Sequence, residues 1–200
     1  MSGRENANDK LMRLIRDIEA TLENIKSYKE AHKNACRLLE KQGYLSDITT
    51  LQNLYLKNLV IYYFSLLEYI ASSLFLIFLE DIRNNIASSS SEKSIMITIM
   101  LNTAGIAKDE SGTFTKFRLN IKKILDCFKS YKEDNYPNSL EEFKNMRNKI
   151  HENWITAQIT YQSEKEIEKS FQEATKYICQ IFENVLCVEL WSKLNISYMD

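Results

Sequence analysis

Apolar side chains recur every three or four residues along most of this chain, which is the spacing of one face of an α-helix. The pattern predicts a first helix from about Asn8 to Lys41 and a second from Ser46 or Asp47 to about Ile86. It predicts further helices from about Phe114 to Tyr131, from Leu140 onward, and from the Ser163 region to roughly Lys193. Stretches between them, such as Thr103–Thr113 and residues 155–162, are expected to be loops and connectors.

Turn-forming residues are scarce, because the 200 residues include only four glycines and one proline. All-β and doubly wound folds need many more tight turns. We therefore expect an all-α fold: a bundle of four to six helices with one long apolar central helix. Residues 1–44 would form a long N-terminal amphipathic helix that ends at Gly43, and residues 45–200 the rest of the bundle, together as one domain. The serine run Ser88–Ser91 is the clearest expected flexible break, followed by a short apolar segment over 94–102.

The second predicted helix contains an apolar run, Leu59–Leu79, that is long enough to cross a bilayer. Glu68 lies in its middle, where an ionised group in lipid is costly. Tyr62, Tyr63 and Tyr69 also cluster at its centre, whereas a membrane span places tyrosines at its ends. The run therefore favours a central bundle helix and no membrane association. Glu68 itself is expected to be paired, either in a structural role or in support of a functional site.

Two capping boxes mark later helix starts: Ser139-Leu140-Glu141-Glu142 and Ser163-Glu164-Lys165-Glu166. The first would open a helix that carries Arg147 and His151. Their i, i+4 spacing puts both on one helix face, where a guanidinium can grip a phosphate and an imidazole can move a proton near neutral pH. This pairing suits chemistry on a phosphodiester.

The net charge of the whole chain does not favour an anionic ligand, but the charge of the segment around Arg147 does. The chain has a formal net charge of −1, but residues 113–151 carry nine positive and five negative side chains, a local excess of +4. Lys144 and Lys149 in this segment are candidate RNA-binding residues. An ordinary solvated lysine face is the alternative interpretation.

The arrangement of Arg147, Asn148 and His151 in a late helix of an all-α chain resembles the HEPN superfamily (higher eukaryotes and prokaryotes nucleotide-binding). The superfamily signature is an arginine, usually followed by Asn, Asp or His, with a histidine after four to six further residues. Here three residues separate Arg147 from His151, so the spacing is shortened, and Glu152 stands where the shortest usual spacing would put the histidine. The helix Lys57–Asp81 is also similar to the core helix that precedes the motif in several HEPN families, so the resemblance covers roughly residues 45–190.

The resemblance implies a metal-independent endoribonuclease of the toxin or antiphage-defence type that acts as a homodimer on RNA. A ribose 2′-hydroxyl would attack its own phosphate, with His151 as general acid or base and Arg147 stabilising the charge on the phosphoryl oxygens. Asn148 would bind the phosphate or orient the histidine, and Glu68 and Glu152 would have supporting roles. An antitoxin or another defence-system protein would be a further partner.

Two non-catalytic interpretations stay open. The chain could be a HEPN-like helical module that binds a partner protein or a nucleotide, or an unrelated helical interaction protein. In the second case Arg147 and Lys149 would be surface charges, and His151 would stabilise the end of its helix through the helix dipole. Trp154 would be a hydrophobic anchor more readily than a base-stacking residue.

The remaining reactive residues indicate no further chemistry. Cys36, Cys127, Cys179 and Cys187 show no CxxC spacing, so we expect no metal site, no cofactor and no disulfide framework. The polar N-terminus predicts no signal peptide, and together these features predict a cytoplasmic protein. His32 lies among polar neighbours and is expected to be a surface residue.

Overall fold

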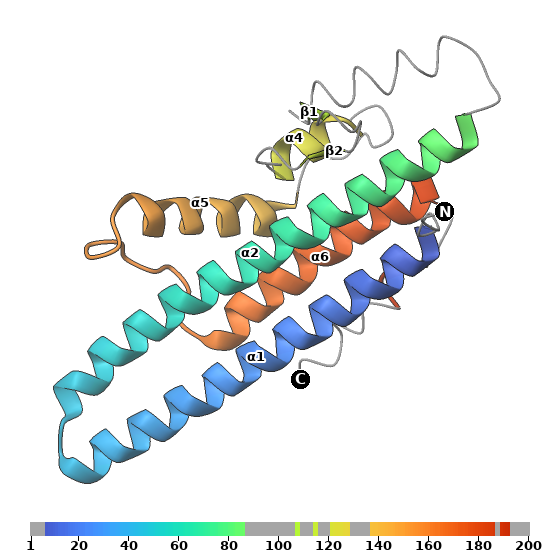
Figure 1. Cartoon of the computed structure of the whole chain (residues 1–200). Helices are drawn as coiled ribbons and strands as arrows, with labels where there is room; N and C mark the ends of the chain where they lie inside the picture. Colours follow the sequence, from blue (N-terminus) through green and yellow to red (C-terminus); the bar gives the residue numbers. More distant parts are fainter. Residues whose placement is uncertain are drawn as a thin grey trace. The chain divides into compact units, whose positions relative to one another are not determined.

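A computed structural model describes residues 7–86, 107–108, 114–115, 121–128, 137–186 and 189–192. In chain order the elements are α1 (Ala7–Gln42), α2 (Leu45–Ile86), β1 (Ala107–Lys108), β2 (Phe114–Thr115), α4 (Ile121–Asp126), α5 (Asn138–Glu152) and α6 (Glu164–Leu186) (Figure 1). The two short strands pair antiparallel, with Ala107 opposite Thr115 and Lys108 opposite Phe114. Helices make up nearly all of the described residues, and α2 is long and apolar, so the predicted all-α bundle class is confirmed.

The turn between α1 and α2 consists of two residues, Gly43 and Tyr44, and has the geometry of a glycine helix cap. Gly43 has φ of 81°. Its N–H donates to the Glu40 carbonyl at 3.1 Å, and the Tyr44 N–H donates to the Leu39 carbonyl at 3.0 Å. This pair of bonds is the Schellman arrangement, in which a left-handed residue satisfies the last carbonyls of a helix. The predicted cap at Gly43 is confirmed.

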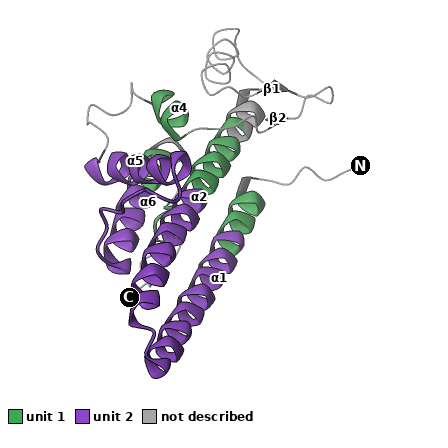
Figure 2. Ribbon diagram, turned by 90° about the vertical axis from the view of Figure 1, so that its left-hand side faces the viewer, with its two compact units in different colours: residues 1–16, 68–135, 178–193 green, residues 17–67, 136–177, 194–200 purple. Residues whose placement is uncertain are grey.

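The chain forms two compact units, which are shown in different colours in Figure 2. Unit 1 comprises Met1–Arg16, Glu68–Asn135 and Ile178–Lys193, and unit 2 comprises Asp17–Leu67, Tyr136–Tyr177 and Leu194–Asp200. The helices α1, α2 and α6 each contribute residues to both units.

An aromatic cluster forms the core of unit 1. The Phe128 ring lies 5.9 Å from Phe75, 5.3 Å from Phe78 and 5.2 Å from Phe182, centroid to centroid, and all four side chains are buried. The pairs of Phe128 with Phe75 and Phe182 are edge-to-face, a geometry that adds to the free energy gained by burial. Phe128 follows α4, so this contact explains how a helix of only six residues is held against α2 and α6.

Unit 2 is built from parts of α1, α2 and α6 together with α5. The Phe64 ring of α2 packs edge-on against Phe143 of α5 at 5.5 Å, and Tyr63 packs against Phe171 of α6 at 4.9 Å. The inner face of α5 is fully buried and consists of Leu140, Phe143, Met146 and Ile150. This face fixes α5 against α2, so the opposite face of α5 is directed to solvent.

Two predicted helix boundaries are wrong. The expected helix from Phe114 to Tyr131 is shorter, since Phe114 and Thr115 pair with β1 and α4 begins only at Ile121. The apolar residues Ile121, Ile124, Leu125 and Phe128 of the expected helix are buried. The last helix ends at Leu186 rather than near Lys193, because Glu183 Oε1 accepts the backbone N–H groups of Leu190 and Trp191, both at 2.7 Å, in a non-helical conformation.

Of the two predicted capping boxes, the one at Ser163 forms in a variant form, in which Glu166 bonds to the N–H of the residue before the N-cap. The Ser163 hydroxyl accepts the Glu166 N–H at 3.4 Å, and the Glu166 carboxylate accepts the Gln162 N–H at 2.8 Å. The box at Ser139 does not form: α5 begins at Asn138 after Pro137 and has no side-chain cap. The Pro137 carbonyl accepts from Leu140 at 3.0 Å, and the Ser139 hydroxyl is buried with no hydrogen-bond partner.

Within the described residues, one stretch, Leu45–Leu79 of α2, is long and apolar enough to cross a membrane by length and composition. Of its most apolar 18-residue window, 61% is buried inside the protein. A core helix of a bundle has the same properties, and a single helix of this kind is weak evidence for a membrane. The expectation of no membrane association stays a prediction, as do the serine loop at Ser88–Ser91 and the apolar segment over 94–102, which lie outside the described residues.

Candidate functional site

The predicted Arg147 motif lies on α5 and is partly ordered by its neighbours. The Arg147 guanidinium carbon sits 5.2 Å from the centre of the Phe64 ring, a cation–π distance, and Nη1 donates to Asn148 Oδ1 at 3.1 Å. Both side chains are half-buried. A guanidinium that rests on an aromatic face and is tied to a neighbouring amide has lost part of its rotamer freedom before any ligand arrives.

His151 lies one turn further along α5, in the last turn of the helix, and its side chain is exposed. Glu152 is the final residue of α5, and both Glu152 and Lys149 are exposed. Lys144 is half-buried and pairs with Glu141 at 3.6 Å. The motif residues therefore share one helix, with Arg147 and Asn148 half-buried and His151, Lys149 and Glu152 exposed.

Glu68, expected as a supporting residue, is half-buried in α2 and belongs to unit 1, whereas the α5 motif belongs to unit 2. Its backbone carbonyl accepts the Ser72 hydroxyl at 2.6 Å. A supporting role of Glu68 for the α5 motif stays a prediction.

The backbone of the segment that follows α5 is fixed by hydrogen bonds from a buried lysine. Lys57 of α2 is 6% exposed, and its ammonium donates to the backbone carbonyl of Trp154 at 2.7 Å and lies 3.5 Å from that of Ile155. The same ammonium lies 6.0 Å from the centre of the Trp154 ring. Trp154 and Ile155 nevertheless keep 40% and 87% of their surface exposed. Their backbone is fixed while their side chains stay available for contact, so Trp154 is only partly the buried anchor that the sequence suggested.

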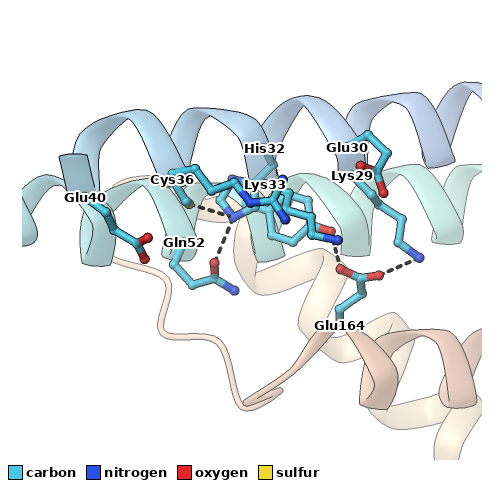
Figure 3. Close-up of a pocket in the computed structure, with 10 residues that line it drawn as sticks. Lys29, Glu30, His32, Lys33, Cys36, Glu40, Gln52 and Glu164 are labelled. Carbon is cyan, nitrogen blue, oxygen red and sulfur yellow. Dashed lines mark hydrogen bonds and ion pairs between the residues drawn. The ribbon is translucent and has the colours of Figure 1, made fainter. Parts of the chain in front are cut away.

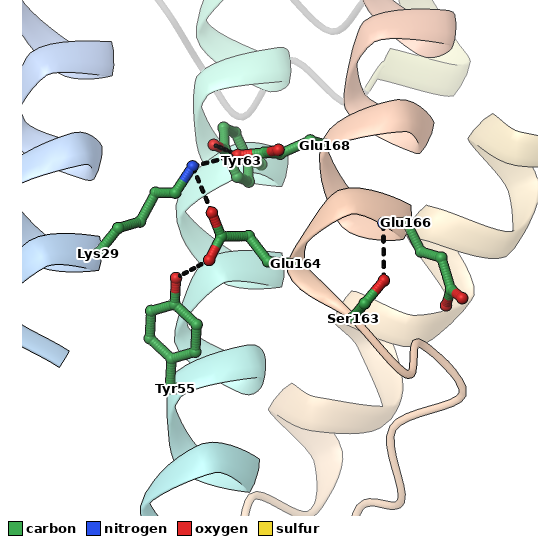
Figure 4. A network of polar contacts seen from close by, with 7 residues as sticks. All are labelled: Lys29, Tyr55, Tyr63, Ser163, Glu164, Glu166 and Glu168. Atoms are coloured by element: carbon green, nitrogen blue, oxygen red, sulfur yellow. Dashed lines mark hydrogen bonds and ion pairs between the residues drawn. The ribbon is translucent and has the colours of Figure 1, made fainter. Parts of the chain in front are cut away.

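Sequence reasoning missed a second group of polar residues, which joins α1, α2 and α6 in unit 2 (Figure 4). The Lys29 ammonium forms ion pairs with both Glu164 and Glu168. The Tyr55 hydroxyl donates to Glu164, and the Tyr63 hydroxyl donates to Glu168 at 3.2 Å. One cation thus compensates two carboxylates, and each carboxylate also accepts a tyrosine hydroxyl. We call these five residues the Lys29 network.

The network shifts the protonation equilibria of its members. Burial alone would lower the pKa of Lys29, but its hydrogen bonds to Glu164 and Glu168 outweigh burial and raise that pKa. Burial, together with the neighbouring carboxylates, raises the pKa of Tyr55 and of Tyr63 far above the ordinary value. Near neutral pH both tyrosines are therefore fixed as hydrogen-bond donors and Lys29 as a cation.

Beside this network lies a pocket of about 550 Å³ (Figure 3). His32 lines it, and the His32 ring stacks parallel on Tyr55 with centroids 3.8 Å apart and an interplanar angle of 3°. His32 Nε2 lies 2.8 Å from Gln52 Oε1 and 3.5 Å from Cys36 Sγ. His32 was expected to be a surface residue; it lines this open pocket, with its ring half-buried against Tyr55 and its Nε2 within hydrogen-bond distance of Gln52.

The sequence contained indirect signals for both features. Glu164 and Glu168 are four residues apart at the start of α6, and Tyr55 and Tyr63 are eight apart on α2, so each pair lies on one helix face. A polar stripe on a helix that is otherwise buried predicts a partner. Periodicity does not reveal that the partner is Lys29, because α1 and α6 are far apart in the sequence.

Among the described residues, no group of three or more His, Cys, Asp or Glu side chains is arranged to hold a metal ion. No protein-family model, curated protein or solved structure matches the chain. The resemblance to HEPN proteins therefore stays an expectation that rests on the α5 residues themselves.

Proposed function

We propose that the protein is an endoribonuclease of the toxin or antiphage-defence type that uses Arg147, Asn148 and His151 on α5. The observation that carries the proposal is the ordered guanidinium of Arg147, supported by Phe64 and Asn148, with an exposed imidazole one helical turn away. A phosphate-binding group held in place before binding, next to a proton-transfer group, is what phosphodiester cleavage requires.

In the proposed reaction the 2′-hydroxyl of RNA attacks the adjacent phosphorus, a P–O2′ bond forms and the P–O5′ bond breaks. The products are a 2′,3′-cyclic phosphate and a free 5′-hydroxyl. Arg147 stabilises the negative charge that builds on the phosphoryl oxygens, and Asn148 positions the guanidinium or the phosphate. No metal ion takes part in these steps.

The reaction needs one group that removes the 2′-hydroxyl proton and one that protonates the leaving 5′-oxygen. His151 supplies one of them in each subunit. In the homodimer that we propose, the partner's His151 supplies the other. Lys144 and Lys149 lie on the same helix and would attract the RNA backbone, and Glu152 would orient the neighbouring imidazole.

The experiment that tests this proposal is incubation of the purified protein with a mixture of structured RNAs in excess EDTA. We expect cleavage that persists in EDTA, leaves cyclic phosphate ends, and disappears in the Arg147→Ala and His151→Ala variants. Arg147→Lys should lose most of the activity, because an ammonium lacks the planar two-pronged geometry. Arg13→Ala, which removes an exposed arginine from α1 in unit 1, is the matched control and should cleave normally.

Intact RNA in every sample would contradict the proposal and favour the second candidate, a non-catalytic HEPN-like helical module that binds a partner protein or a nucleotide. A specific observation favours its protein-binding form: the exposed apolar pair Trp154 and Ile155, whose backbone Lys57 holds in place. In that case Ile155→Asp should abolish partner binding, whereas His151→Ala should not affect it.

A further inference from the structure

The Cys36 thiol stands apart from the other described cysteines in its surroundings. It is half-buried, lines the pocket of about 550 Å³, and lies 3.5 Å from His32 Nε2. Cys127 instead donates to the Lys123 carbonyl, and burial and the nearby Asp126 raise its pKa to about 11. Cys179 is fully buried, which raises its pKa further. Of these three thiols, Cys36 alone lines this pocket and lies beside an imidazole.

The imidazole beside Cys36 is held in one orientation. Its face rests on the Tyr55 ring, and Gln52 Oε1 lies within hydrogen-bond distance of the same Nε2 that faces the sulfur. When Nε2 carries a proton, it can share that proton between the Gln52 oxygen and the Cys36 sulfur. The thiolate is the reactive form of cysteine, and at this position it would accept the Nε2–H. Tyr55 is fixed in turn by its hydrogen bond to Glu164.

The pocket wall carries charges of both signs. Lys33 and Arg37 line it from α1, four residues apart on one helix face, and both side chains are exposed. Glu30 and Glu40 line it at neighbouring positions of the same helix. A volume of this size is within the range of sites for small molecules. The charges match a zwitterion whose carboxylates meet Lys33 and Arg37 and whose ammonium group meets a glutamate.

We propose that Cys36 is a site of reversible S-thiolation, and that its reaction partner is a small peptide-like disulfide that carries carboxylates. The Cys36 proton passes to solvent, and the thiolate, which accepts the His32 Nε2–H, attacks one sulfur of the incoming disulfide. A new S–S bond to Cys36 forms, the S–S bond of the reagent breaks, and the departing thiolate takes up a proton. Cys36 is oxidised, the released half of the reagent is reduced, and no other oxidant is needed. None of the residues on α5 takes part, so this inference is independent of the proposed ribonuclease activity.

The test is a competition between thiols within one molecule. The native protein is treated briefly with glutathione disulfide, which carries carboxylates, or with cystamine, which is cationic, and the mixed disulfides at Cys36 and Cys127 are quantified by peptide mass spectrometry. We expect Cys36 to react roughly tenfold faster than Cys127 and to prefer glutathione disulfide. His32→Gln should slow Cys36 severalfold and leave Cys127 unchanged.

The charge preference provides a second measurement that does not depend on His32. Replacing both Lys33 and Arg37 with alanine removes only exposed charges, so the fold should be retained, and Cys36 should lose its preference for glutathione disulfide. Lys41→Ala is the matched control, since Lys41 is an exposed cation on α1 that does not line the pocket. It should leave the preference intact.

Three results would overturn the proposal. The first is a Cys36 that reacts no faster than Cys127, and the second is a folded His32→Gln variant with an unchanged rate. The third is a Cys36 in the native protein that does not discriminate between the two reagents. The last result decides against the proposal even if His32→Gln disturbs folding, which accelerated reaction at Cys127 and Cys179 would reveal.

Discussion

Replacing Lys29 with methionine removes the cation of the Lys29 network and retains most of the apolar stem of the side chain. Glu164 and Glu168 then lie close to each other at the start of α6 with their tyrosine donors but without a compensating charge. The expected effect is a loss of stability that arises from the charges left behind more than from lost packing.

The magnitude follows from the exposure of the three charged side chains. Removing one partner of a fully buried ion pair costs about 3–5 kcal/mol, whereas exposed pairs contribute about 0–1 kcal/mol. The side chains of Lys29, Glu164 and Glu168 are 24%, 35% and 10% exposed, so water partly screens the carboxylates that remain. We therefore expect Lys29→Met to destabilise the protein by roughly 2–3 kcal/mol, which corresponds to a fall in Tm of about 4–12 °C for a chain of this size.

The assay is urea unfolding followed by circular dichroism at neutral pH, with the midpoint compared at a constant slope. Lys26→Met is the matched control, because Lys26 is also on α1 but pairs at 3.6 Å with Glu23 at 71% and 69% exposure. It should change stability by less than about 0.5 kcal/mol. Adding Glu168→Gln to Lys29→Met removes one of the uncompensated charges and should restore part of the lost stability. The reasoning is refuted if Lys29→Met is no more harmful than Lys26→Met, or if Glu168→Gln adds a further loss in the double variant.

Three more predictions concern single features of the fold. Because the pKa values of Tyr55 and Tyr63 are raised on folding, the stability that they contribute is complete below about pH 10 and is lost as the pH rises further, by about 1.4 kcal/mol per tyrosine at pH 11. Urea midpoints between pH 9 and 11 should therefore fall less steeply in the Tyr55→Phe/Tyr63→Phe variant, and equal slopes would contradict this. Gly43→Ala should lower stability by about 1 kcal/mol in thermal unfolding through its backbone conformation alone, since no atom lies within 4 Å of an added Cβ; an unchanged Tm would count against the cap. Ser163→Ala should cost about 1 kcal/mol, whereas Ser139→Ala should be neutral or slightly stabilising, because the buried Ser139 hydroxyl has no partner; equal losses would contradict the assignment of the caps.

The sequence predicts the long helices well, because the signals that specify a helix lie within the helix itself and at its ends. The bounds expected for α1 and α2 lie within a few residues of those observed, since an apolar repeat and a glycine cap identify a helix without reference to the rest of the chain. The amphipathic character expected for the first helix is seen in α1, where Leu14, Ile15 and Ile18 are buried.

The errors arise where two local signals compete. Ser139 matches a capping box, but Pro137 two residues earlier lets the helix begin at Asn138. The Glu142 N–H then falls within the regular helix ladder, so the serine hydroxyl has no amide to accept. Phe114 and Thr115 likewise continue a helical repeat in sequence but pair with β1 in the structure. Neither outcome follows from the pattern around one position.

The candidate sites show the same difference between residues that are close in sequence and residues that only the fold brings together. Arg147, Asn148 and His151 were found because they are close in sequence, and the structure adds the Phe64 ring beneath Arg147. The Lys29 network was missed because its members come from three helices. The bond between Tyr63 and Glu168 spans 105 residues and that between Lys29 and Glu168 spans 139, and one sequence contains no information on such pairings.

The two-residue turn at Gly43 has a consequence for the order of folding. Contacts between α1 and α2, such as His32 with Gln52 and Tyr28 with Asn58, close loops of only 20 and 30 residues. Loops of this length close faster and at a smaller entropic cost than one of 139 residues. The α1–α2 hairpin can thus assemble early, with Lys29 solvated and unpaired until α6 arrives. An ion pair made after the transition state acts mainly on the unfolding rate. The Lys29 network would therefore determine how slowly the native protein opens, and would have little influence on how quickly it forms.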